Sequence, residues 1–579
     1  WHLAVRIEQP IAGCELAPHP FLKLKSRMHD NATKARMQDT CPHNYVYRWF
    51  RGPKKDPCAN TSCHRNSNFS PAVWATDHTS GDTVLCAVCE RGGVPRYEST
   101  FCSLRCFKDA WKTHSKIHPT LSFATKTEAS SGKKAKEDVL DFVEAVEEED
   151  PSLLVCTDHH YAGSPGDWVE ICNTAAYTPQ PEDVGRVLKV LCSAVAQSNP
   201  AIVLAGPVTV YSSVVLSAPT VPPSRPMRVC NPGSWPSGVS TVGNFRVLSY
   251  NVLAEVYATR QMYPLCDSWS LSWSYRRKML FEEIAKVDPD VLCLQEVQVD
   301  HFESDIKPFL DSIGYSGHHD QKTRESMGQA GKIDGCALFY RRSKMRLAET
   351  YVIKYNDCVR TAVAQQGRLD DQTTSKLIAR LSKDNVAQVA VLEILAPSVD
   401  GSTERTFVCV VNTHLYSNHL YPDVKLWQTV ALLGELENFV SRRDLPLVLC
   451  GDFNSEPQSA VYQFLAEGGV DMGHSDLENV SGKMIPGLES SRHSIELYSA
   501  MQVALGQEPP FTNYTSNFQG TLDYIWFSPS RLRMTSFVDL PDESELVGFQ
   551  GALPNAVYPS DHFFLCSDFI VSSGATSSP

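Results

Sequence analysis

The 579-residue chain has no run of about 18 consecutive apolar residues, the length that a membrane-spanning helix requires. It also lacks a secretory signal, because the start, Trp1–Val5, has no Met, no basic region and no long apolar stretch. We interpret this start as a fragment or a processed end. These absences predict an intracellular protein that has no membrane partner.

Basic residues are in the minority, with 53 Lys and Arg against 66 Asp and Glu, for a net charge of −13. This balance excludes nucleic-acid binding through a uniformly basic surface. A local basic groove, or contact with phosphate through a metal ion, stays open. The chain is 42% hydrophobic and 21% charged, which is typical of a globular protein and excludes disorder throughout.

The cysteine pattern does not fit a secreted disulfide framework, because the total of 19 is odd and several cysteines form close pairs. Eight cysteines fall within the first 106 residues. The others are scattered singly, often inside apolar runs, as at Cys293, Cys409 and Cys450. Scattered cysteines of this kind are typical of buried hydrophobic positions in a reducing compartment.

The chain has no internal repeat and changes character several times. We expect a β-rich region over residues 1–215, interrupted by a Cys- and His-rich segment at 56–120 and an acidic linker at 121–158. A linker with several prolines follows at 216–240, where we expect no regular structure. Residues 241–572 alternate strand and helix signals, so they predict one large α/β domain.

Eight Cys and His residues in the 56–120 segment form four closely spaced pairs. The pairs are Cys58 and Cys63, Cys86 and Cys89, Cys102 and Cys106, and His114 and His118. Zn²⁺ takes four nitrogen or sulfur ligands in a tetrahedron, so eight ligands predict two structural zinc ions. An interleaved arrangement would join the first pair to the third and the second to the fourth. The alternative is a set of unpaired buried cysteines with surface histidines.

The segment from Cys102 to His118 resembles the second half of a MYND zinc finger, with His118 where that family usually has Cys. In the first zinc site, His64 is an alternative ligand to Cys63. MYND fingers bind proline-containing peptides of partner proteins. The resemblance therefore implies that this segment docks a partner and has no catalytic role.

Two segments on either side of the finger look like parts of an immunoglobulin-like sandwich. They are the Trp-containing strand Tyr47–Arg51 and the corner Tyr177–Gly185. We expect one β-sandwich over residues 1–215 with the finger inserted in a loop. Three independent small modules are the alternative.

Within residues 241–572, polar side chains repeatedly follow apolar runs of four to six residues. These side chains are Asn251, Glu296, His414, Asp452 with Asn454, Asp523, and Asp561 with His562. Runs of this length are typical of strands buried on both faces, and a polar residue after such a strand projects from the sheet rim. A lone Asp or Asn there is usually a turn former or a helix cap. Their repetition favours one shared cleft.

The residue types suit phosphodiester hydrolysis, which needs an aligned nucleophile, neutralised phosphate charge and a stabilised leaving oxygen. Glu296 is the best candidate for binding a hard cation such as Mg²⁺. Asp452 would orient a water molecule, and Asn454 would hold the phosphate.

The two histidines of the set, His414 and His562, would donate to developing negative charge, with Asp561 or Asp523 orienting an imidazole. No Ser or Cys lies in a nucleophile elbow, so the sequence does not suggest covalent catalysis.

Residues 244 to about 570 resemble the exonuclease–endonuclease–phosphatase superfamily and, more closely, the carbon catabolite repressor protein 4 deadenylases, and the upstream arrangement of finger and β region is similar to their plant-type branch. The closer resemblance is carried by Ser249–Ala254, Tyr275–Lys278, Leu294–Phe302, Lys332–Ala337, Asp423–Gln428 and Phe511–Thr515. It implies a four-layer α/β sandwich, in which two packed sheets have helices outside. It also implies a cytoplasmic and nuclear Mg²⁺ enzyme that shortens poly(A) tails from the 3′ end and releases 5′-AMP.

The resemblance also assigns roles to single residues. Asn251 and Glu296 match metal-site positions, with Asn251 also near substrate. The positions that match catalytic residues are His414, Asp452, Asn454, Asp523 and His562. Phe518 matches an aromatic that packs on the terminal adenine. The second adenine-packing residue of the family is a Pro five places after His414, where this chain has His419; Pro422 is a nearby substitute.

Poly(A) mRNA is thus the expected substrate, and Mg²⁺ and two structural Zn²⁺ ions are the expected cofactors. No leucine-rich repeat precedes the catalytic block, so we expect the zinc finger to recruit a second subunit of the cytoplasmic deadenylase complex. Two alternatives are a phosphodiesterase of the same fold with another substrate, and a catalytically silent scaffold.

Overall fold

The computed structural model describes most of the C-terminal half of the chain and parts of the N-terminal half. The described residues are 2–7, 9–23, 43–54, 84–85, 100–101, 168–219, 222–231, 233, 239–323, 332–365, 370–395, 405–471, 473–478, 491–547 and 552–573. The chain divides into two units, Trp1–Thr220 and Val221–Pro579. None of the described helices is both long and apolar enough to cross a bilayer.

The first unit contains a four-stranded sheet in the order β6-β3-β7-β8. Its strands are β3 (His43–Lys54), β6 (Val169–Cys172), β7 (Arg186–Ala196) and β8 (Asn199–Val214). A separate antiparallel pair consists of β1 (His2–Arg6) and β2 (His19–Lys23). Because β3 pairs with both β6 and β7, strands from the two sides of residues 55–167 belong to one sheet.

Trp49 on β3 is fully buried and anchors the corner that the sequence pointed to. Its Nε1 donates to the carbonyl oxygen of Thr174 at 3.0 Å, and its ring lies 5.8 Å from that of Tyr177. The Tyr177 hydroxyl donates to Asp183 at 2.6 Å, and Asp183 also pairs with Arg51 of β3. These contacts hold the corner against the strand. The immunoglobulin-like assignment stays a prediction.

Between residues 55 and 167, the structure describes only β4 (Val84–Leu85) and β5 (Thr100–Phe101), which pair antiparallel. All eight predicted zinc ligands, together with His64, lie outside the described residues. The acidic linker at 121–158 lies outside them as well.

The second unit is built on two mixed sheets. The seven-stranded sheet has the order β12-β13-β11-β10-β23-β22-β9. Its strands are β9 (Met227–Val229), β10 (Thr241–Asn251), β11 (Val291–Gln298), β12 (Tyr315–Gln321), β13 (Asp334–Arg341), β22 (Leu532–Val538) and β23 (Leu565–Ser572). The six-stranded sheet has the order β14-β15-β16-β17-β21-β18. Its strands are β14 (Met345–Lys354), β15 (Val386–Ile394), β16 (Thr406–His414), β17 (Leu447–Asp452), β18 (Tyr498–Ser499) and β21 (Asp523–Phe527).

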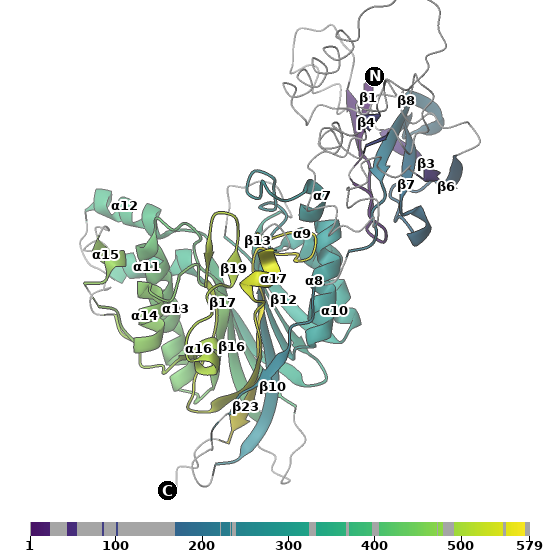
Figure 1. Ribbon diagram of the computed structural model, residues 1–579. Coiled ribbons are helices and arrows are strands. Elements are labelled where there is room, and N and C mark those ends of the chain that lie inside the picture. Colours follow the sequence, from purple (N-terminus) through teal and green to yellow (C-terminus); the bar gives the residue numbers. More distant parts are fainter. Residues whose placement is uncertain are drawn as a thin grey trace, which may run out of the picture. The chain divides into compact units, whose positions relative to one another are not determined.

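Helices cover the outer faces of both sheets (Figure 1). The seven-stranded sheet is covered by α8 (Trp273–Val287), α9 (Val299–His301) and α10 (Lys307–Ser312), and α7 (Ser268–Leu271) precedes them. The six-stranded sheet is covered by α11 (Tyr355–Gln365), α12 (Asp371–Leu381), α13 (Pro422–Ser441) and α14 (Ala460–Glu467). The shorter elements are α15 (Ser475–Glu478), α16 (Ala500–Leu505), α17 (Glu543–Val547) and the β19 (Asn513–Tyr514) and β20 (Gln519–Gly520) hairpin.

Strands that are apolar on both faces explain the four layers. On β17, Val448 and Cys450 belong to the core between the sheets, whereas Leu447 and Leu449 pack against the outer helices. Successive side chains of a strand point to opposite faces, so an unbroken apolar run fills two cores. The four-layer α/β sandwich that the sequence predicted for this unit is confirmed.

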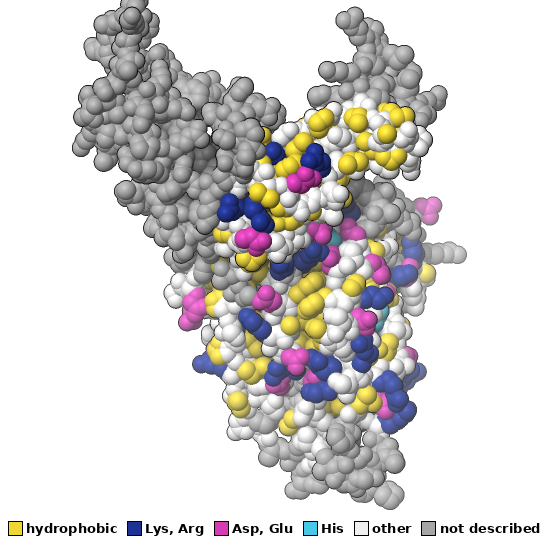
Figure 2. Space-filling view, turned by 90° about the vertical axis from the view of Figure 1, so that its right-hand side faces the viewer, with side chains coloured by type: hydrophobic (Ala, Val, Ile, Leu, Met, Phe, Trp, Pro, Cys, Tyr) yellow, Lys and Arg dark blue, Asp and Glu magenta, His cyan; other side chains and the backbone are white. Residues whose placement is uncertain are grey.

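The helix layer over the seven-stranded sheet has a polar outer face. Lys, Arg, Asp and Glu side chains are interspersed on the molecular face that Figure 2 shows, with no large field of one sign. Arg277 pairs with Asp305, and Lys307 lies 3.8 Å from Glu303. A face of this kind is typical of solvated helices.

One segment differs from the sequence prediction. The linker at 216–240 was expected to have no regular structure, but Met227–Val229 forms β9 at the edge of the seven-stranded sheet. The prolines at 226 and 232 flank these three residues and leave their N–H groups free to pair with β22. An edge strand needs a partner on only one side, so the flanking prolines are tolerated.

Candidate active site

Strand register brings the predicted polar residues to one rim of the sandwich. β10 and β11 are parallel, as are β16 and β17, so each pair ends at the same edge. In this register His414 lies opposite Asp452, and the first residue of the antiparallel β21, Asp523, lies opposite Asp452 on the other side. Residues 38 and 71 positions apart in the chain therefore become direct neighbours of Asp452.

Asp452 is buried at the centre of this rim. Its Oδ2 accepts a hydrogen bond from Nδ2 of Asn251 at 3.0 Å. The Nε2 atoms of His414 and His562 lie 3.5 Å and 3.7 Å from the same oxygen. The other oxygen, Oδ1, accepts from the backbone N–H of Asn454 at 2.8 Å. Asp452 is thus held in one orientation, with two imidazoles directed at it.

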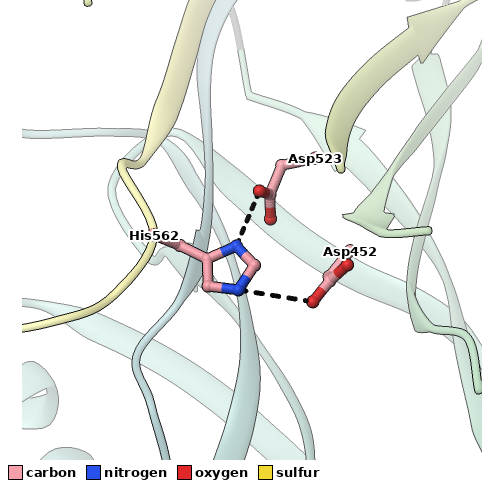
Figure 3. Close-up of side chains that lie close together, drawn as sticks. All are labelled: Asp452, Asp523 and His562. Carbon is pink, nitrogen blue, oxygen red and sulfur yellow. Dashed lines mark hydrogen bonds and ion pairs between the residues drawn. The ribbon is translucent and has the colours of Figure 1, made fainter. Parts of the chain in front are cut away.

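His562 is oriented by Asp523 (Figure 3). The Nδ1 atom of His562 donates to Oδ2 of Asp523 at 2.7 Å, and the same oxygen accepts from the Thr512 hydroxyl at 2.6 Å. Burial opposes the charged imidazole, but the carboxylates of Asp523, Asp561 and Asp452 raise the pKa of His562 well above its usual value. His562 is therefore an imidazolium at neutral pH.

His414 has the opposite character. Burial and the neighbouring Lys322 lower the pKa of His414 to about 4, so its imidazole is neutral at neutral pH. Its Nδ1 has no hydrogen-bond partner among the described residues. The site therefore contains one neutral and one charged imidazole, both directed at Asp452.

Glu296 is turned toward this cluster by a distortion in β11. It has a left-handed backbone (φ 59°), and the pairing of β11 with β13 shifts register between Leu294 and Val297. Such bulges re-aim a side chain at the end of a strand. Its Oε1 lies 3.3 Å from Nδ2 of Asn251, and its Oε2 accepts from the N–H of Ala254 at 2.9 Å.

Asn251 links the two carboxylates with one amide nitrogen, which donates to both Glu296 and Asp452. Its Oδ1 accepts from the N–H of Leu253 at 3.0 Å. This geometry fixes the distance between two strand ends that belong to different sheets.

The remaining predicted residues occupy different positions. Asp561 accepts from the Tyr263 hydroxyl at 2.8 Å and from Asn513 at 3.2 Å, so Asp523 and not Asp561 orients the imidazole of His562. Asn454 has a left-handed backbone (φ 48°), and its Nδ2 donates to the carbonyl oxygen of Leu415 at 3.0 Å.

Phe518 and His419, the predicted base-contacting residues, are both exposed. Phe518 lies in the turn between β19 and β20, and His419 lies in the loop before α13. Pro422 is the first residue of α13. Among the described residues, no hydrogen bond or ion pair joins Phe518 or His419 to the side chains around Asp452.

The donor set fits a hard divalent cation. Candidate ligand atoms of Asp452, Asp523 and His562 lie within 4.8 Å of one another, but His562 as an imidazolium has no lone pair for a cation. Asp523 already accepts two hydrogen bonds, whereas Oδ1 of Asp561 has no hydrogen-bond partner among the described residues. Burial, with Asp561 and Asp334 nearby, raises the pKa of Glu296 to about 7. An oxygen-rich, acidic set of this kind is suited to Mg²⁺.

The sequence analysis missed a buried ion pair beside Glu296. Lys322 Nζ lies 2.5 Å from Asp334, which also accepts from the Tyr257 hydroxyl at 2.8 Å. Asp334 lies in the Lys332–Ala337 segment that carries the family resemblance. This resemblance was the one feature of the sequence that could have identified Asp334 as a residue of the site. Lys322 stands in a polar stretch, where nothing in the sequence marks it as buried.

A chain of buried amides beneath the rim joins the two sheets. Gln295 on β11 donates to Oδ1 of Asn412 on β16 at 2.8 Å. Asn412 in turn donates to Gln388 on β15 at 3.2 Å and to the carbonyl oxygen of Ala337 at 3.1 Å. Gln295 directly precedes Glu296, and Asn412 stands two residues before His414, so these bonds set the spacing between the sheets where the site is built.

The chain is similar to several known proteins. Residues 248–562 match the Endonuclease/Exonuclease/phosphatase family. The chain is 33% identical over 601 residues to Carbon catabolite repressor protein 4 homolog 1 of Arabidopsis thaliana, covering 97% of this chain and 96% of that protein. It is 32% identical over 372 residues to the CCR4-Not complex 3'-5'-exoribonuclease subunit Ccr4 of Schizosaccharomyces pombe, covering 59% of this chain and 51% of that protein. The human Nocturnin catalytic domain with bound sulfate has 26% identity and a TM-score of 0.41, covering 60% of this chain and 97% of its own.

Proposed function

Because the chain belongs to the endonuclease/exonuclease/phosphatase family and, within it, to the carbon catabolite repressor protein 4 homologues, we propose that it hydrolyses RNA from the 3′ end. The substrate is the poly(A) tail of mRNA, and the product is 5′-AMP. The observation that carries the proposal is the convergence of His414, His562 and Asn251 on one oxygen of Asp452. The fission-yeast relative, named as a 3′-5′ exoribonuclease subunit, supports the direction of hydrolysis.

In this proposal Glu296 and Asn251 would hold Mg²⁺, and the Asn251 amide links Glu296 to Asp452. When bound there, the ion would supply positive charge that neutralises the scissile phosphate. The buried ion pair of Lys322 and Asp334 adds a fixed cation beside Glu296. Together these groups lower the electrostatic cost of placing a phosphodiester among several carboxylates.

Asp452 orients the attacking water and accepts its proton. The hydrogen bond from the N–H of Asn454 to Oδ1 leaves Oδ2 as the oxygen that faces the histidines. A base fixed in this way loses little freedom when the water is aligned with the leaving oxygen.

The two histidines both stabilise the negative charge that develops on the phosphate, but they do so in different charge states. His562, charged and oriented by Asp523, donates from Nε2 to a phosphate oxygen as charge develops. His414 is neutral, so it can donate a hydrogen bond to the phosphate without adding a second positive charge beside the proposed metal site. Asn454 holds the phosphate on the Asp452 side.

The test is hydrolysis by purified full-length protein with Mg²⁺. Oligo(A) labelled at the 5′ end should shorten one nucleotide at a time, and a blocked 3′ end or excess EDTA should stop the reaction. Oligo(U) and a phosphoinositide serve as competing substrates, and Asp452→Asn is the inactive control. Cleavage of the phosphoinositide alone would indicate another phosphodiesterase, and no cleavage of any substrate would indicate a scaffold.

The N-terminal region supplies recruitment in our proposal. We infer that the MYND-like finger, with two structural zinc ions, is inserted in a β-sandwich and binds a second subunit of the deadenylase complex. The fission-yeast relative is named as a subunit of the CCR4-Not complex, which supports membership of such an assembly. We also propose a cytoplasmic location with a nuclear fraction; fluorescence microscopy of the tagged chain tests this.

A further inference from the structure

Glu456 and Phe518 face each other across a glycine at the rim of the active site. A Cβ atom added to Gly520 would lie 2.7 Å from Cζ of Phe518 and 3.1 Å from Oε1 of Glu456. Gly520 itself is buried. The absence of a side chain at this position lets the edge of the ring and the carboxylate lie close together.

The ring of Phe518 is presented by a tight, hydrogen-bonded turn. The N–H of Thr515 donates to the carbonyl oxygen of Phe518 at 2.7 Å, and the N–H of Phe518 donates to Oγ1 of Thr515 at 3.0 Å. The same hairpin is tied to the catalytic residues, because Thr512 bonds Asp523 and Asn513 forms a bridge with His562. The side chain is 37% exposed, so the ring has surface available for a ligand.

The carboxylate oxygens of Glu456 can accept further hydrogen bonds. It is half-buried, and among the described residues it makes no side-chain hydrogen bond or ion pair. Lys425, a cation in its vicinity, donates instead to the carbonyl oxygen of Asn454. An ionised carboxylate has about four acceptor positions, so Glu456 can bind a donor that a ligand brings.

We propose that Glu456 accepts a hydrogen bond from the exocyclic amine of the 3′-terminal base stacked on Phe518, and so selects adenine over uracil. The inference rests on the proposed exoribonuclease function and deepens it. An aromatic ring stacks with any base, so Phe518 alone gives little discrimination. Adenine carries a donor at N6, whereas uracil carries an acceptor oxygen at the matching edge.

The chemistry of the pair predicts which feature of the base is recognised. A carboxylate distinguishes an amino group from a carbonyl group, and not a purine from a pyrimidine. Cytosine, which has an N4 amine, should therefore be hydrolysed better than uracil. Inosine, which differs from adenosine by a 6-oxo group, should be a poor terminal nucleotide.

The experiment compares oligo(A) substrates that differ only at the 3′ end, which is adenosine, inosine or purine riboside. Removal of that one nucleotide is followed in single-turnover reactions with the full chain and Mg²⁺. The wild type should prefer terminal adenosine to inosine by about tenfold in kcat/KM, the value expected for one partly solvated charged hydrogen bond. Glu456→Gln should bring the ratio to within about twofold of unity, because an amide can both donate and accept.

Two further variants separate recognition from structure. Glu467→Gln changes an exposed glutamate at the end of α14, close in sequence, and should keep the wild-type ratio. Phe518→Ala should raise KM for all three substrates and leave their order unchanged. The inference would be overturned if Glu456→Gln kept the wild-type adenosine-to-inosine ratio of kcat/KM. This holds whether the variant stays fully active or loses activity equally on all three substrates. Wild-type protein that hydrolyses none of the three would instead overturn the proposed function.

Discussion

The Nδ1 atom of His562 lies 2.7 Å from Oδ2 of Asp523, and both side chains are buried. The contact directs the opposite nitrogen of the imidazole, Nε2, toward Asp452. It also supplies a negative charge beside the ring, which favours the imidazolium. This short contact thus sets the orientation of the histidine, and Asp523 favours its positive charge more than Asp561 or Asp452 does.

Replacing Asp523 with Asn should lower kcat by about 10²-fold or more, because His562 loses its fixed orientation and the carboxylate that most favours its charge. The pKa of His562, measured by NMR of labelled imidazoles, should fall in the variant. Asp357→Asn, which alters an exposed ion pair with Arg360, is the matched control and should keep wild-type activity. An unchanged His562 pKa in Asp523→Asn would contradict this account.

Glu296→Gln and Asp452→Asn should both lose most activity, for different reasons. The first variant has one fewer negatively charged metal ligand, so a high Mg²⁺ concentration should partly restore its rate. The second lacks the base that orients and deprotonates water, which no Mg²⁺ concentration replaces. Titration of both variants with Mg²⁺ in the oligo(A) assay distinguishes them. Equal rescue of the two would refute the division of roles.

Binding of Mg²⁺ should depend on pH through Glu296. Burial and neighbouring carboxylates raise the pKa of this group to about 7, so below pH 7 the metal-free protein holds a proton there. The ion must displace that proton, and its affinity should fall by up to about tenfold per pH unit below 7. Calorimetry in buffers of different ionisation enthalpy should detect the release of nearly one proton at pH 6 and almost none at pH 8. The Glu296→Gln variant should show no such release.

The cysteine-rich segment should bind zinc independently of catalysis. Metal analysis of the full chain should find about two zinc ions, because four ligand pairs complete two tetrahedral shells. Cys102→Ser should lower the zinc content and abolish partner binding, while the rate of RNA hydrolysis stays at the wild-type value. One zinc ion per wild-type chain would favour a single site that excludes Cys58 and Cys63.

His419→Pro should raise the preference for oligo(A) over oligo(U) by a few-fold. A proline packs flat on adenine and brings no hydrogen-bond donor, whereas an imidazole can donate a hydrogen bond to any base or phosphate. Measurement of the oligo(A)-to-oligo(U) ratio of kcat/KM for both proteins decides the point: identical selectivity of the two proteins would remove His419 from the base site.

The residues of the rim could be predicted from local pattern, whereas the four-layer sandwich was implied by the family resemblance. A buried strand is an apolar run, and the polar residue that ends it is visible without knowledge of its neighbours. The partners of those residues depend on strand register, which joins Asp452 to Asp523 across 71 positions of the chain. The sequence therefore left Asp561 and Asp523 as equal candidates for orienting His562.

Burial and charge state were less accessible to sequence reasoning. Nothing in the pattern distinguishes the neutral His414 from the charged His562, because their difference arises from Lys322 on one side and carboxylates on the other. Lys322 itself has polar sequence neighbours, and only the fold places it against Asp334. Glu456 became a candidate only when Gly520 brought it next to Phe518.

The amide chain from Gln295 through Asn412 to Gln388 has a consequence for how this family varies. Changing one member alone leaves a buried donor or acceptor unsatisfied, at a cost of about 1–3 kcal/mol. Replacing the set together by apolar side chains of matching shape avoids that cost. Substitutions at these positions are thus coupled through the protein interior, and relatives should differ at them jointly. A chimaera that takes β11 from one relative and β16 from another must carry matching residues, or its two sheets lose their register at the active site.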